Sequence, residues 1–93
     1  MYYIYILYSD AHDRYYVGQS NDVQRRLAQH NEQEKHAYTT RYRPWRLVKS
    51  YCVGESLGLA RKIENHIKRL KSRKYIEYLL DQETLDSLIN RYS

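Results

Sequence analysis

One stretch, residues 2–30, constrains the fold more than any other part of the chain. It holds two tyrosine-rich segments, residues 2–8 and 14–19, separated by the polar link Ser-Asp-Ala-His-Asp. In a strand, alternate side chains face opposite sides, so Ile4 and Ile6 are expected on one face and Tyr5 on the other. A link of about five residues suits a hairpin loop. We therefore predict an antiparallel pair of strands, with Gly18 near the end of the second.

A helix is predicted to follow this hairpin at once. Asn21, with Gln24 three residues later, is typical of a capping box, which places the start of the helix at residue 20 or 21. Arg26 lies beside an apolar stripe that ends at His30, and the two side chains, four residues apart, share one face. With Tyr5 and Tyr16 on the hairpin, they are expected to form a compact place to hold a phosphate.

The rest of the chain predicts a third strand and further helices. Residues 31–44 show no periodicity and suggest a surface loop, and residues 46–53 suggest a strand with Leu47 and Tyr51 on one face. Helices are expected near residues 55–70, 73–80 and 83–91. The first of these would bury four residues, namely Ala60, Ile63, Ile67 and Leu70. We expect one α+β domain over residues 1–80, with residues 81–93 as a helical tail packed on it.

Glu64 borders the apolar stripe of the helix predicted over residues 55–70. A carboxylate at that edge has two explanations. It either forms a salt bridge with Lys68 at the i+4 position, or it serves a site.

The charge is distributed unevenly along the 93 residues, whose formal net charge is +5. Residues 21–80 are strongly basic, whereas both ends are mildly acidic. This favours a polyanionic partner, nucleic acid first, over an unpartnered basic surface. In the expected loop, Arg41 and Arg43 interleave with aromatic residues, a pattern suited to phosphate contacts and stacking. Trp45, which closes that loop, alternatively fills the core.

Several classes of protein are disfavoured. No long apolar run and no cleavable signal is present, so a cytoplasmic protein with no membrane partner is expected. The single cysteine, Cys52, forms no internal disulfide and is expected to be a buried, inert thiol. Zinc-ligand spacings, a P-loop and a dinucleotide fingerprint are all missing from the sequence. A single carboxylate, completed by phosphate oxygens and water, nevertheless suffices for one Mg²⁺.

The order of these motifs resembles the GIY-YIG nuclease family, in particular its small stand-alone bacterial members. Tyr-Ile-Tyr at residues 3–5 and Tyr-Val-Gly at residues 16–18 are similar to the family signature. The helix over residues 22–30, the segment over residues 37–45 and Ile-Glu-Asn-His-Ile-Lys at residues 63–68 are similar to its later motifs. The resemblance covers residues 2–79. It implies an α/β sandwich with a three-stranded antiparallel sheet flanked by helices, and Mg²⁺- or Mn²⁺-dependent cleavage of DNA.

The resemblance also implies a role for each matching residue. Tyr16 would be the general base or its close partner, Tyr5 would position water or phosphate, and Arg26 would hold the phosphate. Glu64 would ligate the metal, and His30 would be a secondary contact to phosphate or water. Further contacts to nucleic acid are expected from four basic residues, namely Arg25, Arg41, Arg43 and Lys68.

The expected partner is DNA, as a branched, damaged or otherwise non-specific duplex, with a protein partner for targeting as a further option. Two departures from the family pattern stand out: Tyr3 replaces the first glycine of the signature, and no asparagine clearly matches the one that follows the metal-binding helix. Two other functions stay open, namely a non-catalytic nucleic-acid-binding module and a protein adaptor that uses the basic segment 61–74.

Overall fold

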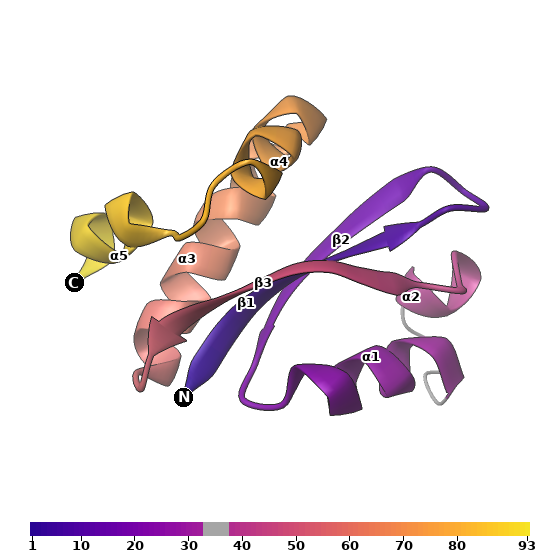
Figure 1. Ribbon diagram of the computed structural model, residues 1–93, viewed down its shortest axis with the longest axis horizontal. Helices are drawn as coiled ribbons and strands as arrows, with labels where there is room; N and C mark the ends of the chain where they lie inside the picture. Colours follow the sequence, from indigo (N-terminus) through magenta and orange to yellow (C-terminus); the bar gives the residue numbers. More distant parts are fainter. Residues whose placement is uncertain (33–37) are drawn as a thin grey trace.

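The computed structural model describes residues 1–32 and 38–93 as a three-stranded sheet with helices on both faces (Figure 1). The strands are β1 (Tyr2–Ser9), β2 (Arg14–Ser20) and β3 (Arg46–Gly54), all antiparallel, in the order β2-β1-β3. Helices α1 (Val23–Glu32) and α2 (Tyr38–Arg41) lie on one side. Helices α3 (Leu57–Leu70), α4 (Arg73–Leu80) and α5 (Asp86–Tyr92) lie on the other. The predicted α+β fold is confirmed.

The alternation of side chains in β1 divides the core into two parts. Ile4 and Ile6 pack with Ala60, Ile63 and Ile67 of α3, and all five are at most 2 % exposed. Each such buried isoleucine contributes about 1.5–3 kcal/mol relative to an exposed one, so this layer provides most of the packing energy. The opposite face of β1 forms a smaller core.

The smaller core contains Tyr5, Leu7 and Trp45, and α1 covers it through partly buried residues that include Leu27. Trp45 is 4 % exposed, and its indole nitrogen donates to the backbone oxygen of Thr39 at 2.7 Å. Of the two explanations for Trp45, the structure therefore supports core filling.

A β-bulge in β3 overturns the predicted face assignment of that strand. Ile6 pairs with Lys49 and Leu7 pairs with Leu47, so one residue of β3 is skipped. An extra residue shifts the side-chain alternation by one position. As a result Leu47 packs in the smaller core while Tyr51 packs in the larger one, contrary to the expectation that they share a face.

Cys52 and Leu70 were predicted to be buried, and both predictions were wrong. Tyr51 and Val53 occupy the core face of β3, so Cys52 takes the other face, where it is exposed. Leu70 ends α3 directly before Lys71, which adopts the left-handed conformation at φ 48°. The helix stops there, and Leu70 is left 49 % exposed.

Several element boundaries also differ from the predicted ones. The N-cap of α1 is Asp22, whose carboxylate accepts from the backbone N–H of Arg25 at 3.1 Å, and the capping box at Asn21 was wrong. The expected loop over residues 31–44 includes the end of α1 and the short helix α2, while residues 33–37 of it lie outside the described residues. Helix α5 begins at Asp86, later than expected.

Two contacts join the C-terminal helices to the sheet. The Tyr51 hydroxyl donates to the backbone oxygen of Leu79 in α4. Leu85 and Leu88 are 2 % and 6 % exposed and belong to the larger core. None of the described helices combines the length and the apolar character needed to span a membrane.

Candidate active site

Tyr5 projects from the middle of β1 toward the α1 side of the sheet, directly across from Gly18 of β2. A Cβ atom at Gly18 would lie 2.4 Å from the Tyr5 hydroxyl oxygen and 2.5 Å from Cζ. The phenol therefore occupies the space that any side chain at Gly18 would need. Packing thus explains the glycine of the Tyr-Val-Gly segment, since Gly18 leaves room for the Tyr5 ring.

Burial and hydrogen bonds hold the Tyr5 phenol in place. The side chain is 1 % exposed, and its hydroxyl is hydrogen-bonded to His30 Nε2 at 3.0 Å. Burial raises the pKa of Tyr5 to about 12, although the neighbouring Arg26 guanidinium acts in the opposite direction. Tyr5 therefore keeps its proton at neutral pH.

His30 lies behind Tyr5, at the C-terminal part of α1, with 2 % of its surface exposed. Its Nδ1 atom is hydrogen-bonded to Thr39 Oγ1 at 2.8 Å. Burial, together with the positive charges of Arg26 and Lys68, lowers the pKa of His30 to about 4. The ring is neutral at pH 7, so one nitrogen donates and the other accepts in a chain from Tyr5 to Thr39.

Tyr16 lies in β2, after the hairpin turn, and its ring forms a triangle with the rings of Tyr5 and His30. The centroid of its ring is 4.9 Å from that of His30 and 6.5 Å from that of Tyr5. The Lys68 ammonium lies 4.8 Å from the Tyr16 centroid. A cation over a phenol ring stabilises the electron-rich ring, and Tyr16, unlike Tyr5, is only partly buried.

Glu64 is the one carboxylate among the predicted site residues, and it comes from α3. Its side chain is 18 % exposed, and it forms a salt bridge with Lys68 at 3.0 Å, as one of its two explanations anticipated. This pairing does not remove it from the site, because Glu64 also lines a cleft with residues of the sheet and of α1.

That cleft has a volume of about 420 Å³ and lies between the end of β2, the start of α1 and α3. Four predicted site residues line it, namely Tyr5, Tyr16, Arg26 and Glu64, and so does Arg25. Arg26 donates to Gln29 Oε1 at 2.6 Å, which orients the guanidinium. Two phenols, a guanidinium and a carboxylate thus share one hollow, although they come from four separate elements, β1, β2, α1 and α3.

Other predicted residues lie elsewhere. His30 supports Tyr5 from behind and does not line the cleft. Arg41 and Arg43 are exposed beyond α1, where Arg43 donates to the backbone oxygen of Asn31 at 3.0 Å. Lys68 lies between the Glu64 cleft and a second groove, described below.

Three polar residues of this region were missed by sequence reasoning. Gln19 and Gln29 line the cleft, and Thr39 contacts the buried His30 ring. Within the described part of the chain, the Gln19 Oε1 atom is buried without a hydrogen-bond partner. Strand alternation places Gln19 on the face opposite to Tyr16, so no local pattern pointed to Gln19 or to Thr39.

The residues of the cleft fit a single hard cation. No group of three His, Cys, Asp or Glu side chains within residues 1–32 and 38–93 forms a complete ligand cage. Mg²⁺ does not need one, since it is often held by one or two carboxylates and completed by water and phosphate oxygens. Glu64 at the wall and the unpartnered Gln19 oxygen supply the oxygen chemistry that such an ion prefers.

The GIY-YIG catalytic domain family matches residues 1–76 of the chain. The chain belongs to the GIY-YIG family. No curated protein and no solved structure gives a significant match. GIY-YIG domains are generally nucleases that act on DNA and typically use divalent metal ions, so nuclease-type activity is the general function of this fold.

Proposed function

We propose that this GIY-YIG protein is a metal-dependent endonuclease that hydrolyses DNA phosphodiester bonds by attack of an activated water. The observation that carries the proposal is the shared cleft of Tyr5, Tyr16, Arg26 and Glu64. Phosphodiester hydrolysis needs a base for water, cations at the phosphoryl oxygens and alignment of the reacting groups. The cleft offers a residue for each need.

Tyr16 is the better of the two tyrosines for the role of general base. Tyr5 has a pKa of about 12 and is bonded to a neutral histidine, so it is suited to donating a hydrogen bond to phosphate or to positioning water. Tyr16 is partly exposed at the cleft, with the Lys68 ammonium over its ring. The phenolate of a tyrosine can accept a proton from an attacking water.

Arg26 and Glu64 would handle the charge of the phosphate. A guanidinium donates parallel hydrogen bonds to two phosphoryl oxygens, and the Gln29 contact holds Arg26 at the cleft. Glu64 would ligate Mg²⁺ or Mn²⁺, which when bound supplies Lewis-acid stabilisation of the charge on the leaving oxygen. Lys68, now paired with Glu64, would be released to the phosphate when the carboxylate takes a cation.

A nicking assay tests the proposal. Supercoiled plasmid is incubated with purified protein and Mg²⁺ or Mn²⁺, and Glu64→Gln and Tyr16→Phe are run in parallel. We expect both variants to lose at least about 100-fold in rate, the size of effect seen when a group that acts in the transition state is removed. Lys62→Gln, on the exposed side of α3, is the control and should nick normally.

The same assay separates the alternative functions. Equal nicking by the wild type and both variants would mean that the cleft is not the source of activity. No nicking in any metal, together with DNA binding that persists in chelator, would instead support a non-catalytic nucleic-acid-binding module.

A further inference from the structure

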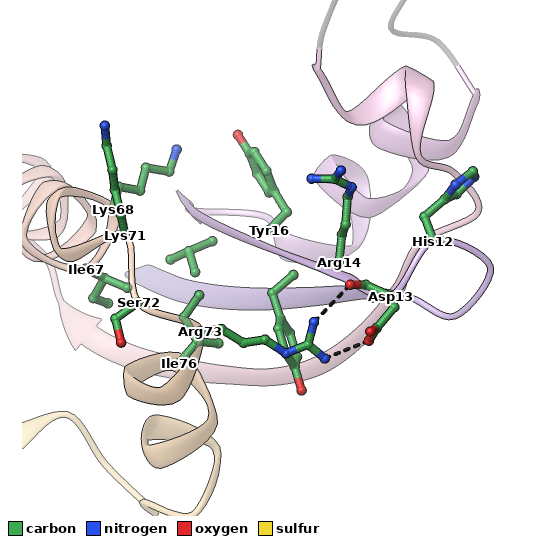
Figure 2. A pocket seen from close by; sticks show the side chains of 12 residues that line it. His12, Asp13, Arg14, Tyr16, Ile67, Lys68, Lys71, Ser72, Arg73 and Ile76 are labelled. Atoms are coloured by element: carbon green, nitrogen blue, oxygen red, sulfur yellow. Dashed lines mark hydrogen bonds and ion pairs between the residues drawn. The ribbon is translucent and has the colours of Figure 1, made fainter.

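A second and larger groove lies on the other side of Tyr16 (Figure 2). Its volume is about 750 Å³, within the range of roughly 300–1,000 Å³ that is typical of ligand sites. One wall is β2, the outer strand of the sheet, and the other is the junction of α3 and α4. No strand in the described part of the chain pairs with the outer edge of β2.

The groove combines an apolar floor with a basic rim. Val17, Ile67 and Ile76 form the floor, and the Tyr16 ring stands at the boundary with the Glu64 cleft. Lys68, Lys71 and Arg14 project on the same side of β2 as the Tyr16 hydroxyl (Figure 2). Such a floor suits the faces of a nucleobase, and such a rim suits phosphate.

The two ends of the groove differ in net charge. At the far end, Arg73 is bonded to Asp13 at 2.6 Å and lies near Glu77, so acidic partners balance its charge. Near Tyr16, Lys68 is paired with Glu64, whereas Lys71 makes no ion pair among the residues that the structure describes, so the charge of Lys71 is not balanced. A phosphate is therefore drawn to the end of the groove that adjoins the cleft.

We propose that this groove is a second subsite, which binds an unpaired nucleotide next to the linkage that lies in the Glu64 cleft. The base lies on the floor at Ile76, and the phosphate is bound by Lys71. A base can reach the floor only if it is unstacked, so DNA with unpaired nucleotides is the preferred substrate. The inference rests on the proposed function, because the cleft must hold the neighbouring phosphate.

Binding tests the subsite without requiring cleavage. The parent is Glu64→Gln in the presence of chelator, and the probes are a short fluorescent single-stranded oligonucleotide and its blunt duplex. Adding Lys71→Gln should weaken binding of the single strand at least about tenfold at moderate salt, as expected for the loss of one hydrogen bond between charged groups. It should also reduce the slope of log K against log salt by about 0.7, the value of one phosphate contact on a single strand.

Lys62→Gln is the matched control, because it removes the same charge from an exposed position of α3 outside the groove. It should change the affinity by no more than about twofold and leave the slope of log K against log salt almost unchanged. Ile76→Glu, which places an anion on the floor, should weaken binding of the single strand more than that of the duplex, provided that its thermal unfolding shows a folded protein.

The outcomes keep this inference apart from the proposed function. Plasmid nicking that depends on Glu64, combined with equal binding by the Lys71→Gln and Lys62→Gln variants, would overturn the subsite and leave the nuclease intact. Equal affinity for single strand and duplex would also overturn it.

Discussion

Substitution of Gly18 by alanine tests how the fold positions Tyr5. The new Cβ would lie 2.4 Å from the Tyr5 hydroxyl oxygen, whereas ordinary contacts are about 3.5 Å, so the ring must move by about 1 Å. Tyr5 is 1 % exposed, so it has little space to move into. Overpacking of this kind costs about 1–3 kcal/mol. A strained Tyr5–His30 hydrogen bond adds to that cost.

Thermal unfolding followed by circular dichroism measures this cost. For a domain of this size, each kcal/mol lowers Tm by about 4–8 °C, so we expect a fall on the order of 10 °C. The nicking rate of the folded variant should also fall, by about 100-fold, because a displacement of about 1 Å at a reacting group has an effect of this size. Gly58→Ala is the matched control, since its nearest neighbour is 3.7 Å away and the residue lies in α3. It should leave stability unchanged or raise it by up to about 1 kcal/mol.

A double-mutant cycle decides whether the tyrosine ring is the cause. Replacing Tyr5 by leucine removes the ring that meets the new Cβ, so Gly18→Ala should cost at least about 1 kcal/mol less in that background. Additive effects, or a Gly18→Ala protein as stable as the wild type, would refute the packing argument.

Three further predictions concern stability and accessibility. The pKa of His30 is about 4 in the folded protein and near 6.5 in the unfolded chain, so the unfolded state takes up the proton first as the pH falls. The free energy of unfolding should therefore fall by up to about 3 kcal/mol between about pH 6.5 and pH 4. Urea titrations measure this fall, which should be smaller for His30→Gln. Leu70→Lys should change the free energy of unfolding by less than about 0.5 kcal/mol, while Ile67→Ala should cost about 2–5 kcal/mol by the same measurement. Equal costs would contradict the exposure of Leu70 at the end of α3. Iodoacetamide should alkylate Cys52 in the native protein without denaturant, as read by mass spectrometry, and protection until unfolding would show that the thiol is covered.

Local patterns in the sequence predicted most of the secondary structure. Alternation in residues 2–8 placed Ile4 and Tyr5 on opposite faces, and the structure confirms it. The same reasoning failed in β3, because a bulge changes the alternation without any glycine or proline to signal it. It also failed at Leu70, where a lysine in the left-handed conformation ends the helix in place of the usual glycine.

The candidate site shows the same division between local and distant information. That Arg26 and His30 share one side of α1 follows from helical spacing, yet only the packing of α1 on the sheet buries His30 against Tyr5 and Thr39. The sequence offered two explanations for Glu64. The structure confirms the salt bridge with Lys68 and also places Glu64 in the cleft, and its role in a site stays a prediction.

The sequence by itself determined the order of the strands and of every described helix except α2, and the membership in the GIY-YIG family, because both depend on residue types at short, regular spacing. Tertiary structure alone decided that a side chain from β1, one from β2, one from α1 and one from α3 share a cleft, and that a second groove opens behind Tyr16. Such neighbours are distant in the chain. Their proximity depends on how the helices pack on the sheet, and no local spacing records that.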